Sequence, residues 1–221
     1  MRRALLAEGL GAMLLTAAVI GSGIMAERLA SGNLAVALLA NTGATVAVLA
    51  TLIALLGPVS GAHFNPAVSF IEALRGHLSV RGAVSYTIVQ ILGCIAGACL
   101  AHAMFELPII QSSAHVRAGP AQWLSESVAT SGLILIVIGS GGSKDAAWRV
   151  SAWIGAAYWF TASTSFANPA ITIARALSNT FAGIAPNNAP AFITSQLCGA
   201  LIGLMLANWL QIGAAREEAA G

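Results

Sequence analysis

The strongest chemical signal in this sequence is a tripeptide that occurs twice, as Asn65-Pro66-Ala67 and as Asn168-Pro169-Ala170. Asparagine is a strong helix N-cap, and proline suits the first helical position because the N–H that it lacks would have no partner there. Each copy therefore predicts the start of a helix. The apolar stretch that follows each copy is too short to cross a bilayer, which takes about 20 helical residues.

A helix that starts inside a membrane leaves free N–H groups and the positive end of its dipole without partners. Such an end is tolerated only where it is buried in protein or lines a watery cavity. Two half-helices that enter from opposite sides would meet near the midplane, with the amides of Asn65 and Asn168 facing a shared lumen. Because positive helix ends face it, that centre favours polar, uncharged solutes and repels cations and protons.

The composition indicates a membrane protein. Hydrophobic residues make up 57% of the chain and charged residues 8%, whereas a soluble domain carries about 25% charged residues. The net charge of +2 is too small to suggest a nucleic-acid partner. The three cysteines form no metal-ligand pattern, and no cofactor is expected. Six apolar stretches are long enough to be membrane spans, the fifth being the shortest: 4–26, 34–56, 82–104, 122–141, 146–163 and 189–212.

The chain also repeats itself. The segment "LLAEGLGAMLLT" opens the first half and "WLSESVATSGLILI" opens the second, and each places one acid, Glu8 or Glu126, near the start of a span. Each half then has two further spans with an Asn-Pro-Ala segment between them. The repeats cover about 1–104 and 122–212 of a single domain, 1–221. Three spans per half is an odd number, so the halves have opposite orientations, as in an inverted-topology repeat.

Basic residues predict the orientation, because cytoplasmic loops are enriched in them. An even number of crossings places both termini on one side of the membrane. Both termini are expected in the cytoplasm, because their side collects seven basic residues and the other side three: Arg2, Arg3, Arg75, Arg81, Lys144, Arg149 and Arg216, against Arg28, Arg117 and Arg175.

These features resemble the major intrinsic protein family, the aquaporins and aquaglyceroporins. The segment "SGAHFNPAV" at 60–68 is close to the first loop motif of the family, and "YTIVQILGCIAGA" at 86–98 matches its third span. The similarity covers nearly the whole chain. It implies an all-α membrane protein with six transmembrane helices and two re-entrant half-helices in a right-handed bundle. It also implies one pore per chain, a homotetramer, and a place in the inner (cytoplasmic) membrane of the cell.

The residue three past Asn168 is Ile171, where most of the family has an arginine at the narrowest point of the pore. Isoleucine offers no hydrogen-bond donor. By offset from the motifs, the resemblance places three other residues in this selectivity filter: Thr45, Ala156 and Ser165. Either Tyr158 or Trp159 could take the place of Ala156. A filter of this kind would be wide, arginine-free and partly apolar, and it should admit solutes larger than water.

The segment "FANPAITIARALSNTFAGIAP" looks most like bacterial aquaglyceroporin-like channels found with arsenic-resistance genes. The resemblance implies a passive channel for water, glycerol-like polyols, and neutral arsenic hydroxides or methylarsenicals. One alternative is a mainly water-selective aquaporin. Another is a coupled secondary transporter, which also uses inverted repeats and broken helices, although the spans lack a chain of ionisable groups for coupling. No activated nucleophile or catalytic cluster is visible, so an enzyme is not expected.

Four further residues have two interpretations each. Glu8 and Glu126 could carry protons, but their symmetric placement favours a structural role, as acceptors for the backbone of the re-entrant loops. His63 could gate the pore with pH or hold the first loop in place. Arg175 lies four residues past Ile171 on the same helix face. It could form a positive ring at the outer vestibule, or it could extend to lipid headgroups or neighbouring loops.

Overall fold

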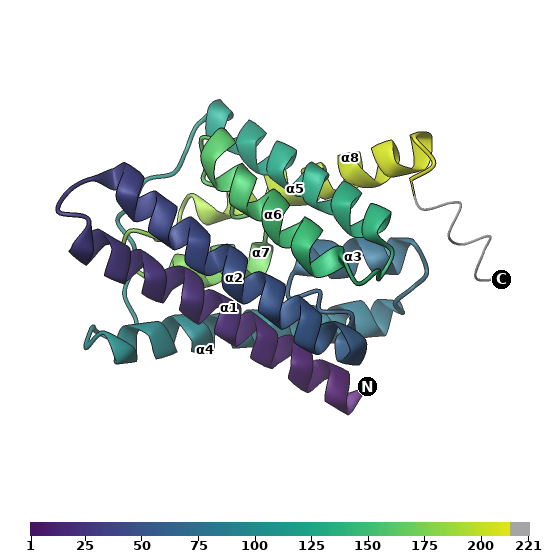
Figure 1. Ribbon diagram of the computed structural model, residues 1–221, viewed down its shortest axis with the longest axis horizontal. Coiled ribbons are helices and arrows are strands. Elements are labelled where there is room, and N and C mark those ends of the chain that lie inside the picture. The colour runs from purple at the N-terminus through teal and green to yellow at the C-terminus, as the bar shows by residue number, and fades with distance from the viewer. Residues whose placement is uncertain (213–221) are drawn as a thin grey trace.

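The computed structural model describes residues 1–212, and these residues form eight helices and no strand. Figure 1 shows long helices on either side of two short ones, α3 and α7. In chain order the helices are α1 (Arg2–Leu29), α2 (Leu34–Ser60), α3 (Pro66–Leu74), α4 (Val80–Met104), α5 (Pro120–Ser140), α6 (Ala146–Phe160), α7 (Pro169–Arg175) and α8 (Ala189–Trp209).

Five of these helices are long and apolar enough to cross a membrane: α1, α2, α4, α5 and α8. The protein is therefore an all-α membrane protein with several long apolar helices. The predicted span 146–163 is wrong in its extent, because α6 has 15 residues and ends at Phe160. Thr161 has extended backbone angles (φ −108°, ψ 141°), so the chain leaves the helix there and continues as a loop to Asn168.

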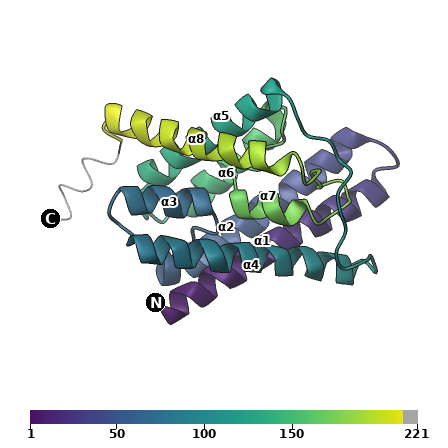
Figure 2. The same cartoon turned by 180° about the vertical axis from the view of Figure 1, so that it is seen from behind.

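The short helices α3 and α7 begin at Pro66 and Pro169, as the N-cap signals predict. The Oδ1 atom of Asn65 accepts the N–H of Ala67 at 2.9 Å, and Oδ1 of Asn168 accepts the N–H of Ala170 at 3.0 Å. These bonds satisfy N–H groups that would otherwise be unpaired at the helix ends. Figure 2 shows the N-terminal ends of α3 and α7 facing each other in the middle of the bundle.

Two pairs of long helices pack closely through glycines. On α4, Gly93 faces the backbone of α1, where a Cβ atom would overlap the carbonyl oxygen of Gly9. On α8, Gly199 faces the backbone of α5 in the same way, at the carbonyl oxygen of Ser127. Small residues let membrane helices approach to backbone contact, so both halves of the chain use the same device to bring a late helix against an early one.

The outer faces of the long helices carry large exposed apolar side chains, including those of Leu39, Leu55, Leu92 and Met205. Exposed apolar surface of this extent is expected where lipid replaces water. The start of α1 and the end of α8 lie at the same end of the bundle (Figures 1 and 2). Arg216, one of the basic residues that predict the orientation, lies outside the described residues.

Candidate functional site

A cavity of about 490 Å³ extends from the C-terminal end of α3 to that of α7, and it passes both Asn65 and Asn168. Aliphatic side chains from the long helices form much of its wall, for example Leu15 of α1, Leu49 of α2 and Leu133 of α5. The polar groups that line it are therefore few, and their positions decide which solutes it can hold.

Each asparagine amide is held by the backbone of the other half of the chain. Nδ2 of Asn65 donates to the carbonyl oxygen of Ala167 at 2.7 Å, and Nδ2 of Asn168 donates to that of Phe64 at 2.8 Å. Because each Oδ1 caps its own helix, the hydrogen bonds define the orientation of both amides. An amide nitrogen has two hydrogens, and within residues 1–212 only one on each nitrogen has a partner. The second remains available to a solute in the cavity.

Two buried carboxylates hold the loops that lead into α3 and α7. Glu8 accepts four hydrogen bonds at 2.6–3.0 Å, from Ser60 Oγ, His63 N, Phe64 N and Gln90 Nε2. Glu126 accepts four at 2.6–2.9 Å, from Ser163 Oγ, Phe166 N, Ala167 N and Gln196 Nε2. Every partner is a donor, and neither acid lines the cavity. This geometry fits loop anchors better than carriers of protons.

The same loops contain residues in left-handed backbone conformations that side chains disfavour. Phe64 has φ 47° and Ala62 has φ 51°, and the equivalent residues of the second loop, Ala167 and Ser165, have φ 47° and 50°. Such conformations cost about 1–3 kcal/mol each and persist only where the surroundings enforce them. The hydrogen bonds to the buried acids supply that enforcement, so the loops can aim both asparagines into the cavity.

Beside the second asparagine, three of the predicted filter residues line the cavity together: Thr45, Ser165 and Ile171. Tyr158 joins them from α6, and its hydroxyl oxygen lies 3.4 Å from Oγ1 of Thr45. Ile171 presents only hydrocarbon here. The wall at this level therefore combines an aliphatic side with a pair of hydroxyl groups.

The prediction that Ala156 lines the cavity is wrong. Ala156 lies on the exposed side of α6, and so does Trp159. Four residues of this helix line the cavity, and they share one face because each lies four residues after the last: Ala146, Val150, Ile154 and Tyr158. The offset from Asn168 misplaces the residue because the chain from Thr161 to Asn168 is a loop, and counting back through a loop does not define which face of α6 a residue occupies. Tyr158, the alternative left open by the sequence, is the residue that reaches the cavity.

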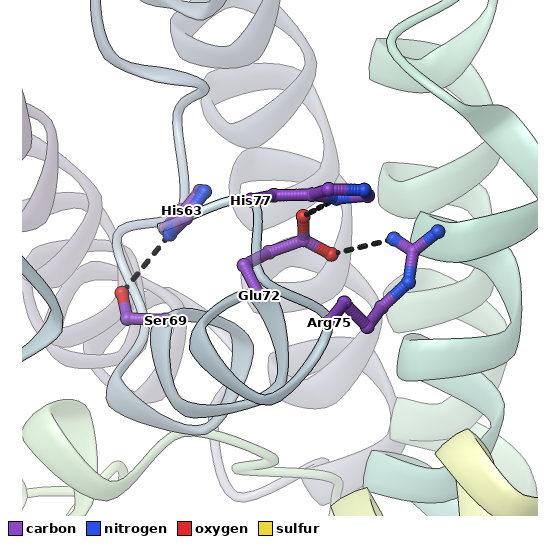
Figure 3. Close-up of polar contacts among 5 residues, drawn as sticks. All are labelled: His63, Ser69, Glu72, Arg75 and His77. Carbon is purple, nitrogen blue, oxygen red and sulfur yellow. Dashed lines mark hydrogen bonds and ion pairs between the residues drawn. The ribbon is translucent and has the colours of Figure 1, made fainter. Parts of the chain in front are cut away.

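At the other end of the cavity, a cluster of charged residues surrounds Glu72 (Figure 3). One carboxylate oxygen of Glu72 contacts Arg75 Nη1 at 2.9 Å, and the other contacts His77 Nδ1 at 2.7 Å. His63 also lines the cavity, and its Nδ1 lies 3.0 Å from Oγ of Ser69. Its ring is thus held on the N-terminal part of α3, which fits a role in fixing the first loop. The sequence predicts no role in the pore for Glu72, Arg75 or His77, although Arg75 is one of the basic residues that predict the orientation.

Arg175 does not extend to the surface: it is 3% exposed and lines the cavity. Its Nε donates to the carbonyl oxygen of Ala182. Its guanidinium carbon lies 3.3 Å from the centroid of the Phe166 ring, a cation–π arrangement. The predicted extension to lipid headgroups is therefore wrong, whereas the predicted contact with a neighbouring loop is present at Ala182.

Arg117, from the loop between α4 and α5, approaches the same Phe166 ring, with its guanidinium carbon 5.1 Å from the centroid. Its nitrogens donate to three carbonyl oxygens of the second half, those of Ser163, Phe181 and Gly183. Burial lowers the pKa of the Arg117 guanidinium, and the nearby Glu126 carboxylate opposes that shift. Within residues 1–212, no group of three or more His, Cys, Asp or Glu side chains could hold a metal ion.

Comparison with known proteins agrees with this geometry. The model of the major intrinsic protein family matches residues 1–141. The chain is 53% identical over 210 residues to the aquaglyceroporin AqpS of Rhizobium meliloti (strain 1021), covering 94% of this chain and 90% of that protein. It is 28% identical over 232 residues to a probable glycerol uptake facilitator protein of Thermotoga maritima, covering 93% and 98%. It is 35% identical over 143 residues to the lens fiber major intrinsic protein of Gallus gallus, covering 62% and 53%. The chain therefore belongs to the major intrinsic protein family.

Proposed function

We propose that this protein is a passive transmembrane channel for small uncharged solutes. The observation that carries the proposal is the pair of asparagine amides, which face one cavity with one hydrogen free on each. They offer hydrogen bonds to a hydroxyl-bearing solute but no charge that would compensate the dehydration of an ion. Family membership and the 53% identity to a protein named an aquaglyceroporin support the same function.

The channel is a single domain, 1–221, of six transmembrane helices and two re-entrant half-helices in a right-handed bundle. The shortest of the six spans is α6, the fifth in chain order, which packs along α2 and α5. The inverted repeats are about 1–104 and 122–212. Matching contacts support this division: Gln90 donates to Glu8 and to Ser69 Oγ, just as Gln196 donates to Glu126 and to Thr172 Oγ1.

The selectivity filter consists of Thr45, Tyr158, Ser165 and Ile171. Without an arginine at position 171, this level of the pore has room for solutes larger than water. The two hydroxyls of Thr45 and Tyr158 can orient a polyol, while Ile171 contacts its hydrocarbon side. Glycerol-like polyols, neutral arsenic hydroxides and methylarsenicals share the properties that this wall accepts, since all are small and uncharged.

A mainly water-selective channel is the second candidate. It is favoured by one contact, the 3.4 Å approach of the Tyr158 hydroxyl to Thr45 Oγ1, which places a large aromatic side chain in the cavity wall at the level of the filter. The two candidates differ in the ratio of glycerol to water permeability, and they share the same fold and the same asparagine pair.

The protein belongs in the inner (cytoplasmic) membrane with both termini in the cytoplasm, so that the cluster around Glu72 faces the cytoplasm and Arg175 lies on the outer side of the asparagines. The excess of basic residues at the end of the bundle that holds the start of α1 supports this orientation. Large apolar side chains on the outer faces suit lipid and the contacts of a homotetramer. We expect neither a nucleic-acid partner nor a cofactor.

Passive permeation is tested by glycerol flux into proteoliposomes, followed by stopped-flow light scattering. We expect the initial rate to increase in proportion to the glycerol gradient. Glu72 is the one carboxylate among the described residues that line the cavity, and because it is paired with Arg75 and His77 at one end it is not placed to couple flux to an ion. Collapsing the sodium and proton gradients with ionophores should leave the rate unchanged. A rate that saturates and depends on either ion gradient would indicate a coupled transporter instead.

A further inference from the structure

The half-helices α3 and α7 carry opposite charges at equivalent positions. The residue three past each asparagine is aliphatic, Val68 in α3 and Ile171 in α7. The residue seven past each asparagine is charged, Glu72 in α3 and Arg175 in α7. All four line the same cavity. Moving outward from the asparagines in either direction, a solute therefore meets a hydrocarbon side chain and then, one helical turn later, a charge.

The two charges differ in how they are compensated. Glu72 is paired with Arg75 at 2.9 Å and with His77 at 2.7 Å (Figure 3). Arg175 has no carboxylate oxygen within 4 Å in the part of the chain that the structure describes. The one buried acid near it, Glu126, is occupied by four other donors. The charge of Arg175 is therefore the uncompensated one of the pair.

The guanidinium of Arg175 is held in place but keeps free donors. Its Nε donates to the carbonyl oxygen of Ala182, and its plane is supported by the Phe166 ring. Its two Nη nitrogens make no hydrogen bond within residues 1–212. Both keep some accessible surface, so neither is a fully buried atom without a partner. Since Arg175 lines the cavity, the cavity is where these nitrogens remain accessible.

Arg117 adds to the positive field without facing the cavity. Each of its three guanidinium nitrogens, Nε, Nη1 and Nη2, donates to a carbonyl oxygen. Arg117 is not among the residues that line the cavity. Together with Arg175 it places two cations near the single acid Glu126. This end of the cavity thus has an excess of positive charge, of which Arg175 is the part that a solute can contact.

We propose that Arg175 determines the charge selectivity of this pore, in place of the arginine that position 171 lacks. The proposal rests on the proposed channel function. The guanidinium is charged at neutral pH, and a fixed positive charge at the wall raises the energy of a cation that has lost part of its water. Displacement by one turn, about 6 Å at 1.5 Å per residue, separates two tasks. Arg175 repels cations, while the level of Ile171 stays apolar and open to larger neutral solutes.

The test compares potassium leak with glycerol flux in the same proteoliposomes, for wild type, Arg175→Gln, Arg175→Lys and Arg28→Gln. Arg28 is the matched control, because it also donates to a backbone carbonyl and lies over an aromatic ring, that of Phe105, without lining the cavity. We expect Arg175→Gln to retain glycerol flux and to leak potassium at least about tenfold faster than wild type. Arg175→Lys and Arg28→Gln should remain as tight to potassium as wild type.

Glycerol flux with wild-type tightness to potassium in Arg175→Gln would overturn the proposal, since the half-helix dipoles would then exclude cations alone. Absence of glycerol flux in every protein, wild type included, would instead reject the proposed channel function. If Arg175→Gln does not insert into the membrane, the test uses Arg175→Cys instead. This variant is treated with a cationic or with an uncharged thiol reagent, the two reagents being of similar size. A cationic reagent should abolish the potassium leak and an uncharged one should not, with treated wild type as control; equal effects of the two reagents would overturn the proposal.

Discussion

Asn65 and Asn168 each perform two tasks with one amide group. The oxygen caps the half-helix that the residue starts, and the nitrogen crosses to a carbonyl of the opposite loop. These two hydrogen bonds connect the loops before α3 and α7, so that the remaining amide hydrogens point into one cavity. The positions of these asparagines depend on hydrogen bonds that hold the loops in place, because both loops have left-handed backbone at residues other than glycine. The buried acids are the residues on which that support rests.

The substitution Glu126→Gln tests the support at the residue scale. A glutamine amide has one acceptor where the carboxylate has two, and its NH₂ group would face donors of the second loop. Leaving buried donors unpaired costs about 1–3 kcal/mol each, so we expect the free energy of unfolding in detergent to fall by about 2 kcal/mol or more. Thermal unfolding of the purified variant measures this, and Glu27→Gln, at the end of α1, is the control. A stability equal to wild type would contradict the anchoring role.

At the scale of the elements, the positions of α3 and α7 depend on how closely the long helices approach each other. Gly93 and Gly97 bring α4 to the backbone of α1, and Gly199 and Gly203 bring α8 to that of α5. These contacts place Gln90 and Gln196 where they reach the buried acids. Helix spacing and loop geometry are therefore coupled, and a change at a glycine should reach the asparagine pair.

The substitution Gly93→Ala tests this coupling. Its Cβ would overlap the carbonyl oxygen of Gly9, which is backbone and cannot turn aside. Overpacking typically costs about 1–3 kcal/mol, so we expect a lower unfolding temperature and reduced glycerol flux per folded molecule. Gly43→Ala is the matched control, since nothing lies within 4 Å of its added Cβ. Alanine there should be neutral or slightly stabilising, by up to about 1 kcal/mol. Equal behaviour of the two variants would refute the close-approach argument.

At the scale of the whole molecule, features that depend on a few neighbouring residues can be predicted from the sequence, whereas features that depend on tertiary contacts cannot. The helix starts at Asn65 and Asn168 are predictable because a cap acts within a few residues. The position of Ala156 is not, since it depends on the length and path of the loop after α6. Nor are the partners of Arg175, because Phe166 and Ala182 come from two separate loops. The charge on Glu72 could have been found from the repeat, because Glu72 and Arg175 follow their asparagines at the same distance.

The central claim is that an arginine-free filter at Ile171 lets this channel pass solutes larger than water. The most direct measurement is the ratio of glycerol to water permeability of wild type and Ile171→Arg in proteoliposomes, by stopped-flow light scattering. We predict that wild type passes glycerol and that the ratio falls at least about tenfold in Ile171→Arg, a difference of roughly 1.4 kcal/mol in barrier height. A wild-type protein that passes water but not glycerol, or a ratio unchanged by the arginine, would contradict the account.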